Sequence, residues 1–311
     1  MPFPPRALAL GVALATTLSL PTLASDPEPF ALRGLGDHLA MLSLTPGDVV
    51  TLAAYDPETG QPLSVRWSSD AGAIAHGSRD ARWKAPDAPG VYPLVGTAQH
   101  GERSFRRQLN AFVTVPAHHA RNGVINGYRV GRYPALTASN GRTSVSRSTR
   151  TAPDLPAGFI KLDAVSRKAK LSRHFTLGQF ETKDGPRESK YMFVNERLIA
   201  KLERIVDDLA AAGYEADGLR IMSGYRTPAY NAGIGNQTSL SRHTYGDAAD
   251  ILADDWNRDG RITRDDAQIL YRIADRIDQT TDLKGGLSLY KPTSTHGWFV
   301  HVDARGKASR W

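Results

Sequence analysis

The sequence predicts two folded domains: an all-β, immunoglobulin-like sandwich over residues 25–116 and an α+β domain with a small antiparallel sheet over residues 158–311. Three observations predict this division. Short β-rich runs separated by turn clusters extend from about Leu44 to Val115. Two later segments place apolar residues at helical spacing. β-rich runs that are predicted to form a small antiparallel sheet come after the helices, and this order is typical of α+β domains.

Residues 1–24 have the pattern of a signal peptide for export. The charged start ends at Arg6, an uncharged stretch runs from Ala7 to Leu20, and Ala24 provides a small residue for cleavage. This stretch is shorter than the ~20 apolar residues that a transmembrane helix needs. We therefore expect an exported protein of the periplasm or the extracellular space, with no membrane span in the mature chain. The chain contains no cysteine, so we expect no disulfide.

Four short runs predict the strands of the N-terminal domain: residues 49–53, 64–67, 91–95 and 111–115. Turn clusters rich in Pro, Gly and Asp lie between them. Trp67 and Trp83 are available for the core, and the spacing of the runs is typical of an immunoglobulin-like sandwich. No run carries catalytic residue types, so we predict a spacer or a docking module.

Residues 117–157 are rich in Gly, Ser and Arg, which predicts a partly extended connector. Between Ala117 and His174 the sequence has eleven Lys or Arg residues and only two Asp. A segment with this excess of positive charge attracts polyanions. For an exported protein, anionic cell-wall polymers or lipid head groups are the expected partners, and no dedicated nucleic-acid binding is expected. A solvated linker without a partner is the alternative.

In the C-terminal domain, helical segments come before the strands that are predicted to close a small antiparallel sheet. Asn195 is placed to cap a helix that Gly213 ends, and a strand follows at residues 219–222. The second helix covers residues 267–277. Residues 285–290 and 298–303 are predicted to close the sheet.

Two histidines and one carboxylate form the most informative pattern in the chain. His243 and Asp250 lie in the segment Ser-Arg-His-Thr-Tyr-Gly-Asp-Ala-Ala-Asp (residues 241–250), and His301 follows about fifty residues later. These are ligand types of a catalytic zinc ion, which uses three protein ligands and keeps a fourth position open. Gly246 keeps side-chain bulk out of the loop between the first two ligands. The pattern predicts zinc-activated water as a nucleophile.

This pattern, Ser-x-His-x-x-Gly-x-Ala-x-Asp with a downstream His-x-Asp, resembles that of the zinc D-alanyl-D-alanine carboxypeptidases and murein endopeptidases. Their superfamily also includes lysostaphin-type enzymes and the hedgehog signalling domain. The resemblance covers about Phe175 to Trp311 and not the β-rich domain. It implies that His243, Asp250 and His301 bind zinc. It also implies that Arg226 steadies a substrate carboxylate or a developing oxyanion.

The general base is the point at which the sequence departs from the family. Many relatives have a glutamate three residues before the last histidine ligand, where this chain has Trp298. Other members use a histidine five residues before that ligand, and His296 stands there. Asp303 is the second candidate, as in some endopeptidase relatives. Its alternative role is to orient His301 through the other ring nitrogen.

Residues 255–266 predict a calcium loop directly after the zinc motif. Oxygen ligands fall at positions one, three, five, seven, nine and twelve, with glycine at position six. The predicted ligands are Asp255, Asn257, Asp259, Arg261 (through its carbonyl), Thr263 and Asp266. Aspartate replaces the usual glutamate at position twelve. The alternative is a turn that caps the next helix without metal.

Together these observations predict an exported zinc metallopeptidase that hydrolyses amide bonds in peptidoglycan stem peptides. Carboxypeptidase and endopeptidase activity are both compatible with the motif. Two alternatives stay open at this stage. One is a catalytically silent wall-binding module that keeps its zinc, and the other is a calcium-dependent adhesive surface protein.

Overall fold

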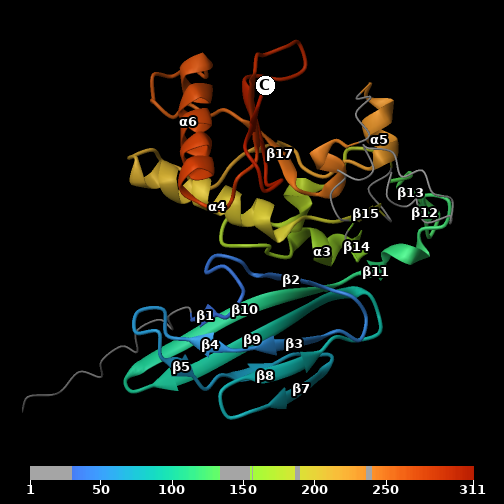
Figure 1. The fold of residues 1–311 in the computed structure, drawn as a ribbon, viewed down its shortest axis with the longest axis vertical. Helices are drawn as coiled ribbons and strands as arrows, with labels where there is room; N and C mark the ends of the chain where they lie inside the picture. The colour runs from blue at the N-terminus through green and yellow to red at the C-terminus, as the bar shows by residue number, and fades with distance from the viewer. Residues whose placement is uncertain (1–29, 134–154, 156, 186–189, 236–239) are drawn as a thin grey trace, which may run out of the picture.

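The computed structural model describes residues 30–133, 155, 157–185, 190–235 and 240–311 of the chain. The predicted export signal lies outside the described residues. Figure 1 shows the N-terminal sheets in blue to teal on one side and the C-terminal domain in yellow to red on the other. No helix in the described part of the chain has the length and apolarity needed to cross a membrane.

Three sheets form the N-terminal domain. The first has the order β2 (Met41–Leu44), β10 (Arg103–Val113), β9 (Gly90–His100) and β6 (Arg66–Ser68). The second has the order β3 (Val49–Leu52), β8 (Ala81–Lys84) and β7 (Ala73–His76). The third contains β1 (Ala31–Leu32), β4 (Ala54–Tyr55) and β5 (Pro62–Leu63).

One apolar core lies between these sheets. It includes Trp67 of the first sheet, Trp83 of the second and Leu63 of the third. The two tryptophans are 3% and 0% exposed, so their predicted place in the core is confirmed. The four predicted strands are also confirmed, although β9 and β10 extend well beyond the predicted runs. The immunoglobulin-like topology stays a prediction.

The first part of the predicted connector is folded rather than extended. β11 (Val115–Pro116) pairs with β14 (Gly158–Leu162), which pairs with β15 (Lys190–Met192). A 3₁₀ turn, η1 (Ala117–His119), and a hairpin of β12 (Val124–Ile125) and β13 (Tyr128–Arg129) follow β11. The hydroxyl of Tyr133 lies 2.7 Å from that of Tyr225 inside the C-terminal domain. Residues 134–154, with most of the predicted connector, lie outside the described residues.

A five-stranded sheet organises the C-terminal domain. Its order is β16 (Ile221–Ser223), β17 (Ala248–Leu252), β19 (Phe299–Asp303), β18 (Gly286–Tyr290) and β20 (Ser309–Arg310). The helices are α3 (Ala164–Lys168), α4 (Glu196–Ala211), α5 (Pro228–Gly233) and α6 (Arg264–Thr280), with 3₁₀ turns η2 (Leu177–Phe180) and η3 (Arg242–Tyr245). The two predicted helices and the predicted closing strands are confirmed.

Helices α4 and α6 begin at side-chain caps and cover one face of this sheet. The Asn195 side chain accepts a hydrogen bond from Arg197 N at 2.9 Å, and the Thr263 hydroxyl accepts one from Asp265 N at 3.2 Å. Val300 and Val302 of β19 are fully buried in the core that contains both helices. Successive strand residues point to opposite faces, so His301 points away from these helices.

The two domains share an apolar core. Leu39, Met41 and Phe112 of the N-terminal domain belong to the same buried cluster as the residues of α4 and α6. Backbone and side-chain hydrogen bonds cross the same boundary, from Ala40 N to Leu171 O at 2.8 Å and from Asn110 Nδ2 to Lys170 O at 2.9 Å. The N-terminal domain is therefore packed against the C-terminal domain over a buried, apolar contact.

Candidate metal centre

Strand register brings the ligand types of the sequence motif together. On adjacent antiparallel strands, Asp250 of β17 lies directly opposite His301 of β19. Ser223, at the end of β16, lies opposite Asp250 on its other side. Side chains directly opposite each other on one sheet face are near neighbours. The sheet therefore places the carboxylate and the second histidine side by side, although they are far apart in the sequence.

His243 reaches the same point from the turn η3. The turn ends at Gly246, whose φ of +64° lies in the left-handed region that favours glycine. A Cβ atom there would lie 2.6 Å from Phe193 O, which is too close for any other residue. Gly246 thus allows the chain to turn directly from His243 into β17. The predicted need for glycine in this loop is confirmed.

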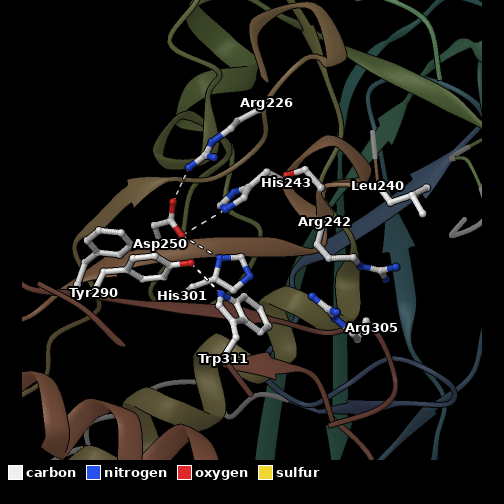
Figure 2. A pocket seen from close by; sticks show the side chains of 11 residues that line it. Arg226, Leu240, Arg242, His243, Asp250, Tyr290, His301, Arg305 and Trp311 are labelled. Atoms are coloured by element: carbon white, nitrogen blue, oxygen red, sulfur yellow. Dashed lines mark hydrogen bonds and ion pairs between the residues drawn. The ribbon is translucent and has the colours of Figure 1, made fainter. Parts of the chain in front are cut away.

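His243, Asp250 and His301 form one buried cluster, shown in Figure 2. Their candidate ligand atoms all lie within 4.8 Å of one another. Asp250 Oδ1 lies 3.3 Å from His243 Nε2 and 2.9 Å from His301 Nδ1. Donors bound 2.0–2.1 Å from one tetrahedral zinc ion are about 3.3 Å apart. The three side chains therefore have donor atoms that zinc accepts, and the two distances from Asp250 are close to this spacing.

The second nitrogen of each histidine ring faces an oxygen of the protein. His243 Nδ1 lies 2.7 Å from Gly224 O, and because a carbonyl only accepts, Nδ1 carries the proton. In neutral His243 a lone pair on Nε2 then faces an oxygen lone pair of Asp250, an arrangement that a bound cation satisfies. His301 Nε2 lies 3.4 Å from Asp303 Oδ2. Such outer partners are typical of metal-binding histidines.

Burial and mutual contact shift the pKa values of this cluster in opposite directions. Burial lowers the pKa of His243, and Asp250 opposes this only in part. Burial alone would raise the pKa of Asp250, but the adjacent rings of His243 and His301 hold it well below its usual value. Burial would lower the pKa of His301, yet hydrogen bonds to Asp250 and Asp303 raise it. The carboxylate is therefore ionised and available as a ligand.

Arg226 lies next to the cluster, as the family resemblance implies. Its Nη2 donates to Asp250 Oδ2 at 2.5 Å, and its Nε donates to Ser223 Oγ at 2.9 Å. The side chain is 14% exposed and lines the same cavity as the cluster. The guanidinium thus touches the carboxylate oxygen that does not face the histidines, and stands at the edge of the space open to a ligand.

Asp303 is the more buried of the two candidate bases, and its oxygens are occupied. Oδ1 accepts a hydrogen bond from Gly286 N at 2.7 Å, and Oδ2 accepts one from Arg305 Nη2 at 2.5 Å. Burial would raise the pKa of Asp303, but the hydrogen bonds from His301 and Arg305 hold it well below its usual value. This geometry matches that of a carboxylate that orients His301.

His296 lies outside the cluster. Its Nδ1 lies 2.9 Å from Gly297 O, and its ring packs edge-on against Phe299 at a centroid distance of 4.9 Å. Phe299 lines the cavity next to the cluster. Trp298, at the position where many relatives have glutamate, is partly buried just before β19. The side chain of Phe299 therefore lies between the His296 ring and the cavity.

The predicted calcium loop uses its oxygens for internal hydrogen bonds. Asp255 Oδ2 accepts from Gly260 N at 2.8 Å, and Asp266 Oδ2 accepts from Thr263 N at 2.8 Å. Thr263 and Asp266 thereby form the capping box of α6. Across the described chain, the one group of three metal-ligand side chains that gathers is the His-Asp-His cluster. Calcium binding at Asp255, Asn257, Asp259, Arg261, Thr263 and Asp266 stays a prediction.

Sequence reasoning missed several residues of the cavity wall. The cavity has a volume of about 600 Å³ and is also lined by Arg242, Arg305, Tyr290 and Trp311. Trp311 Nε1 donates to the Tyr290 hydroxyl at 2.8 Å, and its ring lies 5.3 Å from that of His301. Arg242 is adjacent to His243, and Arg305 follows the His-x-Asp pair by two residues. For Arg242 and Arg305, closeness in sequence to the metal-binding motif was the signal that could have indicated a place in the cavity wall.

Comparison with known proteins finds one family model that matches part of the C-terminal domain. Residues 173–264 match the family model described as peptidase M15. The matched stretch contains His243 and Asp250 and ends before His301. The match supports a peptidase of the M15 zinc peptidase family in this domain. No curated protein matches the chain.

Three solved structures that are similar to part of the chain illustrate how weak the structural matches are. The titin M3 domain is 19% identical, with 27% of this chain and 95% of that chain covered and a TM-score of 0.19. The PKD domain from human VPS10 domain-containing receptor SorCS2 is 15% identical, with 36% and 94% covered and a TM-score of 0.21. The S-layer protein rSbsC(31-844) is 15% identical, with 28% and 14% covered and a TM-score of 0.19. These TM-scores are too low to establish a shared fold.

Proposed function

We propose that the chain is a zinc metallopeptidase that hydrolyses amide bonds in peptidoglycan stem peptides. The observation that carries the proposal is the convergence of His243, Asp250 and His301 on one point beside a cavity. The family match at residues 173–264 supports the same conclusion. Three protein ligands next to open space are the arrangement of a catalytic zinc site rather than a closed structural one.

The ligand geometry supports zinc as the ion. His243 Nε2, His301 Nδ1 and Asp250 Oδ1 supply two nitrogens and one oxygen, which zinc accepts readily. When bound there, zinc supplies a Lewis acid that lowers the pKa of a water molecule and polarises an amide carbonyl. Gly224 O holds the ring of His243, and Asp303 faces that of His301, so both lone pairs are directed before any ion arrives.

The other residues of the site divide the remaining tasks. Arg226 presents a planar set of donors at the cavity and stabilises negative charge on a substrate carboxylate or on the oxygen of the attacked carbonyl. Asp303 orients His301. We assign the base to His296, whose ring packs against Phe299, a residue of the cavity wall. We place the base on His296 because the oxygens of Asp303 are already occupied.

Digestion of purified sacculi tests the proposal. The full chain is stripped of metal with a chelator, reloaded with zinc and incubated with sacculi, and the products are identified by mass spectrometry. Loss of terminal D-alanine indicates a carboxypeptidase, and conversion of cross-linked dimers to monomers indicates an endopeptidase. His301→Ala should abolish either change, whereas His100→Ala, at an exposed site on β9, should not. Wall binding without any zinc-dependent product would instead favour the silent or adhesive module.

We further propose that the protein is exported to the periplasm or the extracellular space, and that the basic connector holds it near anionic wall polymers. The signal-like residues 1–24 and the charge excess between residues 117 and 174 support this. Fractionation of cells that produce the full chain tests the location. Recovery of the uncleaved chain in the cytoplasm alone would contradict it.

Calcium at residues 255–266 is a second proposed metal, with a structural role. The spacing of oxygen-bearing residues supports it, and the loop begins five residues after Asp250. Calcium would rigidify the segment that carries this zinc ligand. Chelator-treated protein reloaded with zinc alone should therefore stay below full activity and thermal stability. Complete recovery with zinc alone would refute the idea.

A further inference from the structure

The cavity beside the His-Asp-His cluster has two chemically different sides. Figure 2 shows Tyr290 on one side and Arg242 and Arg305 on the other, with the cluster between them. On the aromatic side, Tyr290 and Phe299 are stacked with centroids 4.6 Å apart and an interplanar angle of 4°. A peptide that crosses this cavity therefore meets apolar rings on one side of the cluster and guanidinium groups on the other.

In both Arg242 and Arg305, one edge of the guanidinium group is hydrogen-bonded to an aspartate. Asp247 receives hydrogen bonds from Nε and Nη2 of Arg242. Asp303 receives hydrogen bonds from Nε and Nη2 of Arg305, at 2.9 Å and 2.5 Å. A guanidinium carries five N–H donors in a rigid plane. In each arginine, Nη1 has no hydrogen-bond partner within the described residues, so these donors are fixed in direction and available to an acceptor.

These two arginines also link the cavity to a second one. That cavity has a volume of about 520 Å³, shares Leu240, Arg242 and Arg305 with the first, and continues to Arg197 and Lys307. The residues lining the two cavities include five Arg or Lys and only two acids, Asp247 and Asp250. Arg242 and Arg305 are 17% and 22% exposed, so solvent screens them less than the exposed Lys307. Asp247 and Asp303 offset the charges of Arg242 and Arg305, so this path offers an acceptor directed guanidinium donors rather than a large net positive charge.

We propose that Arg242 and Arg305 form a carboxylate-binding subsite that selects peptides with an acidic group beside the scissile amide. The inference rests on the proposed peptidase function and adds a specificity determinant distinct from Arg226. A carboxylate fits because it is planar and accepts parallel hydrogen bonds from guanidinium donors. The Asp247 and Asp303 partners keep the two guanidinium planes in place before substrate binds, so little ordering is needed.

Matched peptides test the subsite. The substrates are the pentapeptide L-Ala-D-isoglutamate-diaminopimelate-D-Ala-D-Ala, the same peptide with the isoglutamate α-carboxylate amidated, and the same peptide with the diaminopimelate ε-carboxylate amidated. We expect one of the amidations to lower kcat/KM for the zinc-loaded wild type about 10- to 100-fold, as expected for the loss of a charged hydrogen bond. High salt should reduce this preference.

Variants connect the preference to the two arginines. In Arg242→Gln and Arg305→Gln, the ratio of kcat/KM for the acid peptide to kcat/KM for the amide peptide should approach one. This ratio is the readout because a general loss of activity lowers both values equally. Arg242→Lys, which keeps the charge without the planar donors, should retain a reduced preference. Arg204→Gln is the control, since Arg204 pairs with Asp208 on α4 and lines neither cavity.

The outcomes separate this inference from the proposed function. Equal cleavage of acid and amide peptides by the wild type overturns the subsite and leaves the peptidase function standing. The same holds if both glutamine variants keep the full preference. If the zinc-loaded wild type cleaves neither these peptides nor sacculi, the peptidase function fails, and the subsite fails with it.

Discussion

Replacing Asp303 by asparagine distinguishes an orienting carboxylate from a general base. Asp303 is 0% exposed and faces His301 Nε2 at 3.4 Å. Loss of an outer partner of this kind weakens zinc binding by about 10- to 100-fold. Loss of a general base instead leaves zinc affinity unchanged and lowers kcat by about 10²- to 10⁴-fold. We expect the first result, because the oxygens of Asp303 are occupied by Gly286 N and by Arg305.

The assay is hydrolysis measured against free zinc set by a chelator buffer. For Asp303→Asn, the zinc concentration at half-maximal activity should rise about 10- to 100-fold, and saturating zinc should restore most of the activity. Stability should fall by about 3 kcal/mol in urea unfolding, the low end of the range for breaking a buried ion pair, because Arg305 remains 22% exposed. Asp282→Asn, at a side chain that is 86% exposed, is the charge-matched control. An unchanged zinc midpoint with a hundredfold lower plateau would refute the reasoning.

Three further substitutions test the base, the core and the turn. His296→Ala should lower kcat by about 10²- to 10⁴-fold at saturating zinc; a loss below threefold would rule His296 out. Lys201→Met should cost about 3 kcal/mol in urea unfolding, the low end of the range for breaking a buried ion pair, because Lys201 Nζ donates to Asp278 Oδ1 at 2.5 Å while Arg310 keeps its contact with Asp278 Oδ2. A cost under 1 kcal/mol would contradict this. Gly246→Ala should cost more than the ~1–2 kcal/mol of a left-handed backbone alone, since its Cβ would lie 2.6 Å from Phe193 O. Unchanged stability of Gly246→Ala in urea unfolding would show that the turn shifts to accommodate the added Cβ atom.

The metal-ligand cluster could be predicted because most of the residues that define it lie close together in the sequence. His243, Gly246 and Asp250 lie in one short segment, and the spacing of ligand types is sufficient to predict a metal site. His301 was predictable from its place in the motif. Its position directly opposite Asp250 depends on the register of β17 and β19, which no local pattern specifies.

Other parts depended on contacts between distant segments. Lys201 lies on a helix with the usual amphipathic spacing, and nothing in the sequence indicates that its ammonium group is buried against Asp278 and the Asp303 carbonyl. The hairpin of β12 and β13 at the start of the connector could have been predicted from the sequence. Asn126-Gly127 is a dipeptide favoured in two-residue hairpin loops, and both residues have positive φ between β12 and β13. The Gly- and Arg-rich composition of the surrounding segment obscured it.

The shared packing of Leu39, Met41 and Phe112 with the helical domain has a practical consequence for dissecting the molecule. A fragment that begins at residue 158 would leave the apolar surface beneath these three side chains bare, and such a surface promotes aggregation. The two halves should accordingly lose their structure in a single cooperative transition on heating. The β-rich half would then act as a fixed part of the folded protein rather than as a flexible attachment.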